Sequence, residues 1–327
     1  MREYVAQNIL HALVAAGVIE TLLRVWRLGD PAERLVFRLL ALTLPLVVGP
    51  FYFVVAPFRT GPAFADSFAL FASTHWRAVR LGSLETGGLL LAVAAVAGVL
   101  LYFRDLAPLV RGVRSREGSG VEMSADEPLA RTVAELSKRV GLRAPPRMFF
   151  LDDDAPVLLA SGVTKPSLSV SRGTLGRLDE AELRATLTHE LVHLGRGDVL
   201  LGWIVMVVRT LMLFNPIAQL IARGVVVEME RRADDTAARV LEAPRVLADG
   251  MERLVGERLR IGMPREQTRP AALDGLVLGL ATKGRVAALA RRCSRLRENW
   301  PPPHQALPGF RVGVTGFALA GLLFFVV

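Results

Sequence analysis

Two histidines and a glutamate in the segment Thr-His-Glu-Leu-Val-His, residues 188–193, are spaced to hold and use a metal ion. In a helix, residues four positions apart lie on one face, so the rings of His189 and His193 can reach the same ion. Glu190 would then stand beside a water molecule bound to that ion. There a carboxylate acts as general base, while zinc acts as Lewis acid and lowers the pKa of the water. The segment therefore predicts metal-assisted hydrolysis.

An acidic pair downstream supplies the ligand that two histidines lack. Glu230 and Asp234 lie in residues 225–241, which are expected to form a second helix. Catalytic zinc takes three protein ligands and a water, so we expect Glu230 to be the third ligand. Asp234 follows one turn later, where it is expected to hydrogen-bond a ligand histidine and fix its tautomer. The alternative is a pair of ordinary helix histidines and a surface acid.

Charged neighbours of Glu230 could be mistaken for parts of the site. Glu228 is two residues away, so it is expected to point to the other side of the helix. Asp235 is expected to be a solvated acid near Arg231. The oxyanion that develops during hydrolysis needs a second donor besides the metal. Arg231 and Arg232 are the candidates that the sequence offers, and a solvated helix face is the alternative for both.

Local signals place these residues on defined elements. Asp179 and Glu182 form the pattern of a capping box at the start of the motif helix, and Gly197 suits its end. An amphipathic helix is expected upstream at residues 125–140. Three short strands are expected at residues 147–151, 156–160 and 167–170. The last of these strands could bind an extended substrate by edge pairing.

The composition indicates a membrane protein. Of the 327 residues, 52% are hydrophobic, which is high for a soluble chain of this length. The net charge is +9, but the arginines flank apolar runs, so they indicate membrane topology and we expect no nucleic-acid partner. A single cysteine, Cys293, excludes a disulfide framework and a cysteine-ligated zinc site. We expect it to be a packing or surface thiol.

Four apolar runs could cross a bilayer. A spanning helix needs about 20 apolar residues. The second and third runs reach this length alone, the first needs flanking residues, and the last stops slightly short. They cover residues 4–19, 39–58, 87–103 and 312–327. His11 inside the first run is expected to face a neighbouring helix rather than form a pore.

Arginine counts in the short loops orient the chain. Several arginines follow the third run, and the loop of residues 59–85 is less basic for its length. We therefore place residues 104–311 in the cytoplasm. The predicted domains are residues 1–103 with three spans, residues 104–311 around the metal motif, and residues 312–327 as a last span.

Two further stretches leave alternatives open. Residues 199–214 are apolar and could dip into the bilayer, although Arg209 near their middle favours a helix buried in protein. Residues 285–297 form a basic amphipathic stretch. This stretch is either a solvated helix or a contact with anionic lipid headgroups.

The motif segment resembles membrane zinc metallopeptidases. Residues 188–198, THELVHLGRGD, and the Phe-Asn-Pro element at residues 214–216 are similar to the beta-lactam sensor/transducer peptidases (BlaR/MecR type). Residues 230–234 and the Ala-Ser-Gly stretch at residues 160–162 are closer to the HtpX and CAAX-prenyl endopeptidases. The resemblance covers roughly residues 126–300. It implies a mainly α membrane protein, a multi-span helical bundle with a cytoplasmic α+β zincin (gluzincin-like) peptidase domain.

Carried over to this chain, the resemblance implies site roles. His189, His193 and Glu230 would be the zinc ligands, Glu190 the base, and Asp234 the residue that orients a ligand. Two departures stand out. An asparagine-containing strand usual in HtpX-type enzymes has no counterpart here. The BlaR/MecR sensors continue into a penicillin-binding domain, whereas this sequence stops at residue 327, so beta-lactam sensing is not an expectation from it.

The expected function is peptide-bond hydrolysis by a multi-pass zinc endopeptidase of the cell membrane. Its expected cofactor is Zn²⁺, and its partners are protein or peptide substrates and the lipid bilayer, with self-association open. The alternative is a signal transducer that cleaves itself or one repressor-like partner. A metal carrier is a weaker alternative, because the apolar runs lack paired acids or histidines.

Overall fold

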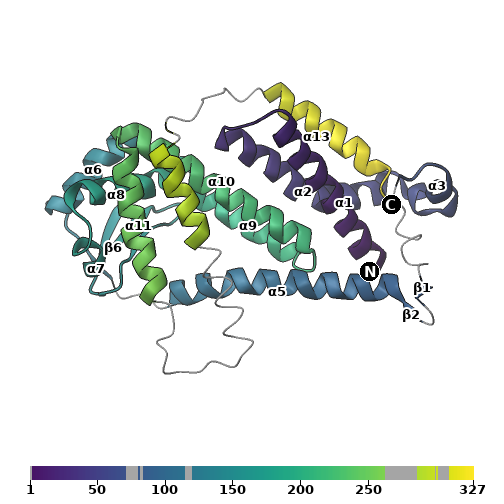
Figure 1. Cartoon of the computed structure of the whole chain (residues 1–327), viewed down its shortest axis with the longest axis horizontal. Coiled ribbons are helices and arrows are strands. Elements are labelled where there is room, and N and C mark those ends of the chain that lie inside the picture. Colours follow the sequence, from purple (N-terminus) through teal and green to yellow (C-terminus); the bar gives the residue numbers. More distant parts are fainter. Residues whose placement is uncertain are drawn as a thin grey trace. The chain divides into compact units, whose positions relative to one another are not determined.

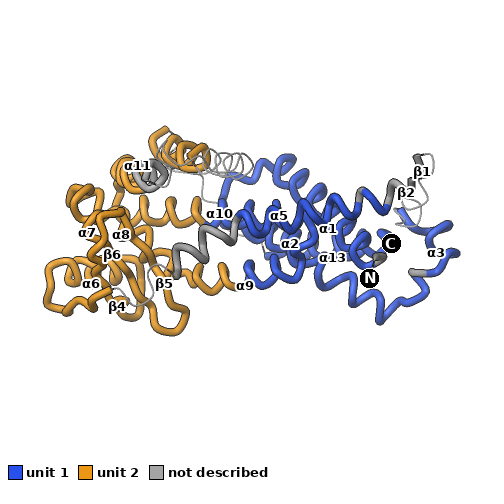
Figure 2. Tube along the Cα trace, turned by 90° about the horizontal axis from the view of Figure 1, so that it is seen from below, with its two compact units in different colours: residues 1–106, 204–229, 303–327 blue, residues 107–203, 230–302 orange. Residues whose placement is uncertain are grey.

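The computed structural model describes residues 2–70, 80–81, 84–114, 120–261, 286–298, 300 and 309–327. These residues form two compact units that are interleaved along the chain (Figure 2). Unit 1 contains residues 1–106, 204–229 and 303–327, and unit 2 contains residues 107–203 and 230–302. Helices α5, α9 and α10 each contribute residues to both units.

Unit 1 is built from helices (Figure 1). Asp30 begins the second helix by accepting a 2.7 Å hydrogen bond from the Ala32 amide. The elements of the unit are α1 (Arg2–Val25), α2 (Pro31–Val55), η1 (Pro57–Thr60), α3 (Pro62–Ser67), α13 (Gly309–Phe324), parts of α5 (Thr86–Arg114), α9 (Asp198–Leu211) and α10 (Pro216–Leu241), and the strand pair β1 (Arg80–Leu81) and β2 (Leu84–Glu85).

Two helices of unit 1 are long and apolar enough to cross a membrane. Residues 4–25 of α1 and residues 31–55 of α2 have mean hydropathies of 1.5 and 1.8. Shorter apolar helices cover residues 91–104 and 309–324, so the third and fourth predicted spans stay predictions. Helices α8 (Glu180–Arg196) and α9 would be long enough only together, and they meet at 66°.

Buried polar groups tie the helices of unit 1 together. His11 Nε2 lies 2.8 Å from the Val326 carbonyl oxygen, so His11 faces a neighbouring segment as predicted. Arg59 is buried and donates to the carbonyls of Phe324, Leu323 and Val326 at the end of α13. Arg209 is also buried and donates to Gln219, whereas Trp203 and Val207 of the same apolar stretch are exposed, so the placement of residues 199–214 stays a prediction.

Unit 2 contains a four-stranded sheet in the order β3-β4-β6-β5. The strands are β3 (Gly120–Glu122), β4 (Arg147–Leu151), β5 (Leu158–Ser161) and β6 (Ser167–Ser171). Strands β4 and β6 are parallel, and the other two pairs are antiparallel. The three predicted strands are present, whereas β3 was not expected. The sheet order also corrects one prediction: β6 is an interior strand, and the edge strands of the described sheet are β3 and β5.

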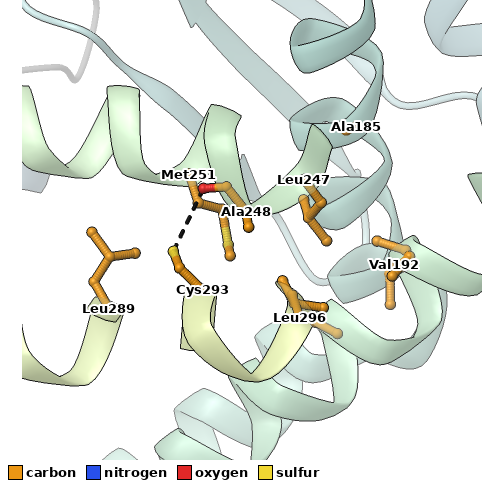
Figure 3. Packing of buried hydrophobic residues seen from close by; sticks show 11 residues of the cluster. Ala185, Val192, Leu247, Ala248, Met251, Leu289, Cys293 and Leu296 are labelled. Atoms are coloured by element: carbon orange, nitrogen blue, oxygen red, sulfur yellow. Dashed lines mark hydrogen bonds between the residues drawn. The ribbon is translucent and has the colours of Figure 1, made fainter. Parts of the chain in front are cut away.

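Helices cover this sheet and form two cores. The first core joins the sheet to α6 (Pro128–Val140) and α8 through fully buried side chains, including Leu136, Leu168, Leu187 and Leu191. The second joins α8 to α11 (Pro244–Ile261) and to a helix at residues 286–298 (Figure 3). Cys293 lies inside the second core and donates to the Ala248 carbonyl at 3.5 Å, so it is a packing thiol.

Candidate metal centre

The helix that carries the histidines is fixed at both ends. At its start the Asp179 carboxylate accepts from the Glu182 amide at 2.8 Å, and the Glu182 carboxylate accepts from the Asp179 amide at 3.1 Å. This is the predicted capping box. At its end Gly197 takes the left-handed conformation with φ +69°, which suits a residue without Cβ. Side chains on α8 therefore project from a rigid element.

The structure brings the three predicted ligands together. The Nε2 atoms of His189 and His193 are 3.2 Å apart. Glu230 Oε2 lies 3.6 Å from His189 Nε2, and Oε1 lies 3.7 Å from His193 Nε2. Zinc bonds to nitrogen and oxygen of about 2.0–2.2 Å would place tetrahedral ligand atoms about 3.4 Å apart. The three residues therefore lie near the spacing of zinc ligands, with one Glu230 oxygen close to each histidine.

A buried carboxylate faces the other ring nitrogen of each histidine. Asp234 Oδ1 lies 3.2 Å from His189 Nδ1, on the predicted side of the ring, but the contact does not have the geometry of a hydrogen bond. Asp198 Oδ2 lies 2.8 Å from His193 Nδ1, a contact that sequence reasoning missed. Because each Nδ1 faces an acid, each Nε2 is left to face a metal. The signal for Asp198 is its place directly after Gly197, whose left-handed turn ends the helix.

The charges around the ligands shift their titration. Burial of the His189 ring opposes its protonation, but the carboxylates of Asp234 and Glu230 outweigh this and raise its pKa from 6.5 to about 10. Burial would also raise the pKa of Glu230. The charges of Arg292 and the two histidines instead hold that pKa well below its usual range. The ligand carboxylate is thus ionised at neutral pH, ready to bind a cation.

Glu190 opens onto a pocket beside the edge strand. Its Oε2 accepts a 3.0 Å hydrogen bond from the Ala160 amide of β5. Apolar residues of β5 and α11 share the pocket with the candidate ligands. The lining consists of Pro156, Leu158, Thr186, His189, Glu190, Glu230, Met251, Leu254 and Arg292. A group bound in this pocket would meet the carboxylate of Glu190 together with the candidate ligands His189 and Glu230.

The arginine of this pocket is not one of the two that the sequence analysis named as candidate donors. Arg292, from the helix at residues 286–298, lines it, whereas Arg231 and Arg232 do not belong to its lining. The prediction that Asp235 is a solvated acid is wrong. It is only 5% exposed rather than solvated, because Arg295 of the same helix pairs with it.

Comparison with known proteins identifies the family of the chain. The family model described as BlaR1 peptidase M56 matches residues 65–245, more than half of the chain. The chain belongs to the BlaR1 peptidase M56 family. This confirms the resemblance read from the motif residues. The matched residues include Glu190 and Glu230. They end before the helix at residues 286–298, which carries Arg292.

Relatives of the HtpX type resemble this M56 chain as well. A protease HtpX homolog of Acidiphilium cryptum is 33% identical over 146 residues, 43% of this chain and 48% of the relative. One of Chlorobium phaeobacteroides is 36% identical over 136 residues, 39% and 44% of the two chains. One of Paraburkholderia phytofirmans is 27% identical over 191 residues, 49% and 67%. The chain spans about half the length of the first of these relatives.

Proposed function

We propose that this chain is a zinc-dependent endopeptidase of the cell membrane, with Glu190 as its general base. The observation that carries the proposal is that the ligand atoms of His189, His193 and Glu230 lie within 4.8 Å of one another. Two of these residues, His189 and Glu230, line a pocket together with Glu190. Membership of a peptidase family supports peptide bonds as the substrate. A zinc ion, when bound, would supply Lewis acidity toward the attacking water and the peptide carbonyl.

The side chains divide the remaining work. Glu190 takes a proton from the attacking water and delivers it to the leaving amine. Asp234 and Asp198 face the outer nitrogens of the ligand histidines and hold their rings in orientation. This leaves each carboxylate with one task, proton transfer for Glu190 and orientation for the two aspartates.

The substrate is proposed to be an extended peptide that pairs with β5. Among the described residues β5 is an edge strand, and because its Ala160 amide donates to Glu190, this edge faces the reacting groups. Adding a strand to an exposed sheet edge is a common way to bind extended peptide. Leu158, Met251 and Leu254 offer an apolar wall to a substrate side chain.

The proposed setting is multi-pass membrane insertion with a cytoplasmic peptidase domain. Two helices of unit 1 are long enough to span, and two shorter ones are proposed to complete the set. We retain the proposed division into residues 1–103, 104–311 and 312–327. The proposed partners are protein substrates and the bilayer. Self-association is left to measurement.

Substitution of the base and of one ligand tests the proposal. In the full-length protein, Glu190→Gln should retain one zinc ion per chain but lose hydrolysis of a fluorescently labelled unfolded protein. His193→Ala should lose both zinc and hydrolysis. Cleavage by Glu190→Gln at the wild-type rate would show that another group is the base.

A transducer that cuts mainly itself is the second candidate, favoured by the match to the BlaR1 peptidase model. The test mixes active protein with a tagged Glu190→Gln copy and an unrelated unfolded protein. Cleavage of the tagged copy alone supports the transducer. Cleavage of the unrelated protein supports a general endopeptidase.

A further inference from the structure

Arg292 binds two acidic residues of the candidate metal centre at once. Its Nε and Nη2 donate to the two oxygens of Asp234 at 2.8 and 2.6 Å. Its Nη1 lies 2.7 Å from Glu230 Oε2. Such paired bonds fix direction as well as charge, because the guanidinium is planar and its donors are rigidly spaced.

These contacts constrain the ligand geometry. Glu230 has one oxygen near each histidine, and Arg292 holds the oxygen that lies nearer His189. Asp234 is shared in the same way, since its Oδ1 is 3.2 Å from His189 Nδ1 and 2.6 Å from Arg292 Nη2. Arg292 therefore fixes both a candidate ligand and the carboxylate that orients another.

The charge balance of the site also requires a cation besides the metal. Four carboxylates surround the two histidines, namely Glu190, Asp198, Glu230 and Asp234. A divalent ion would offset two of these charges and Arg292 a third, and Arg295 Nη2 also lies 3.8 Å from the Asp234 carboxylate. Buried carboxylates without a partner carry a large desolvation cost, so removing Arg292 should loosen Glu230 and Asp234.

The donors of Arg292 are largely committed to the protein. Besides the bonds to Asp234 and Glu230, Nη2 contacts Met251 Sδ at 3.3 Å. These contacts use four of the five N–H groups of a guanidinium. A positioning role therefore fits better than direct contact with the reacting carbonyl.

The packing of its own helix against the protein core holds Arg292 in place. Leu289, Cys293 and Leu296 of the same helix insert into the core formed with α8 and α11 (Figure 3). This helix lies beyond residue 245, where the family match ends. The wall of the pocket is thus completed by a later part of the chain.

We propose that Arg292, from the helix at residues 286–298, is a positioning residue for the metal centre, which aligns Glu230 and Asp234 for zinc. The proposal rests on the proposed function, since it takes these residues to bind zinc. It gives the helix a task that neither a solvated surface nor a lipid contact would explain.

Metal binding to the full-length protein tests this directly. Arg292→Gln should weaken zinc binding about 10- to 100-fold in competition with a chelator, the loss usual for an outer partner of a ligand. It should also change the visible absorption of the Co²⁺-substituted protein, because the ligand set is less ordered. Arg292→Lys restores the charge without the planar fork and should recover only part of the affinity.

Arg297→Gln is the matched control. Arg297 lies on the same helix and pairs with Asp249 and Glu252 of α11, away from the ligands. It should keep wild-type affinity and the wild-type Co²⁺ spectrum. Should Arg292→Gln fail to fold, Arg292→Lys decides by the same two measurements.

The outcomes separate this proposal from the proposed function. Wild-type affinity and spectrum in the Arg292 variants, with zinc bound by the wild type, would overturn the role of Arg292 alone. An equal loss in Arg297→Gln would also overturn it, because the effect would then belong to helix docking in general. If the wild-type protein bound no zinc, the proposed function itself would be wrong.

Discussion

At the scale of single residues, the candidate site shows which contacts a sequence can reveal. His189 and His193 are one helical turn apart, and Glu230 and Asp234 are one turn apart, so helical periodicity alone groups each pair. Arg292 and Asp234 are 58 residues apart, and only tertiary packing joins them. The acids were therefore predictable, whereas their cationic partner was not.

Glu230 and Asp234 should differ when each is changed to alanine. Glu230→Ala removes a candidate ligand, so it should strip zinc and abolish activity. Asp234→Ala removes a group that orients His189, so zinc affinity should fall about 10- to 100-fold and some turnover should remain. Elemental analysis of purified variants, with chelator competition, measures both effects.

Glu228→Ala is the control for this pair. Glu228 is fully buried and pairs with Arg34 and Arg38 of unit 1 at 2.9 and 2.8 Å. Breaking such a buried pair costs about 3–5 kcal/mol, so this variant should lose thermal stability but keep zinc. Zinc loss in Glu228→Ala with retention in Glu230→Ala would show that the wrong glutamate was chosen.

Zinc affinity should rise with pH because zinc and a proton compete for His189. The pKa of His189 is raised to about 10 in the metal-free site, so the ring is protonated at neutral pH. Zinc must displace that proton, and affinity should increase by up to about tenfold per pH unit below that value. Chelator competition at pH 6, 7 and 8 measures the slope. In Asp234→Asn, which removes one cause of the raised pKa, the slope should flatten, and a pH-independent wild-type affinity would contradict the prediction.

At the scale of elements, local signals predicted helices and strands better than their arrangement. The capping box of α8 and strand β4 are where turn and cap residues place them. Strand order is a long-range property, so nothing local distinguished the interior strand β6 from the edge strand β5. The edge prediction failed for that reason.

Removing one outward amide of β5 tests the role of the edge. The Ala160 amide donates to Glu190, so it points away from β6. Ala160→Pro removes this donor and leaves the ladder with β6 intact, since proline is tolerated on the free side of an edge strand. A hydrogen bond to a charged group contributes about 1.5–3 kcal/mol, so activity should fall roughly 10- to 100-fold.

Leu159→Pro is the matched control, because amides alternate along a strand and that of Leu159 points toward β6. It should lower the midpoint of thermal unfolding, whereas Ala160→Pro should leave it nearly unchanged. Full activity in Ala160→Pro would exclude a role for this amide in holding Glu190 or substrate.

At the scale of the whole molecule, composition predicted a membrane protein but not the interleaving of its units. Residues 204–229 belong to unit 1, and the residues on either side belong to unit 2. Some arginines that served as topology signals also have structural partners. Arg34 and Arg38 pair with Glu228 inside unit 1. Orientation depends on positive charge near span ends rather than on net charge, so these pairs leave the topology argument in place.

The orientation can be measured with single cysteines at exposed, described positions. In a Cys293→Ser background, one cysteine replaces Ser67 of α3 and another replaces Ser124. Native Cys293 is buried, which raises the pKa of its thiol to about 11, so its removal only clears residual labelling. The arginines after residue 103 predict that Ser124 lies in the cytoplasm and Ser67 outside.

A membrane-impermeant thiol reagent on intact cells should therefore label the cysteine at position 67 and spare the one at position 124. Both should react once the cells are permeabilised, which shows that each position is accessible. The reverse pattern on intact cells would put the peptidase unit outside. The site would then bind zinc and substrates from the extracytoplasmic side. The chemistry proposed for Glu190 would be unaffected, but the proposed cytoplasmic location of the peptidase unit would be wrong.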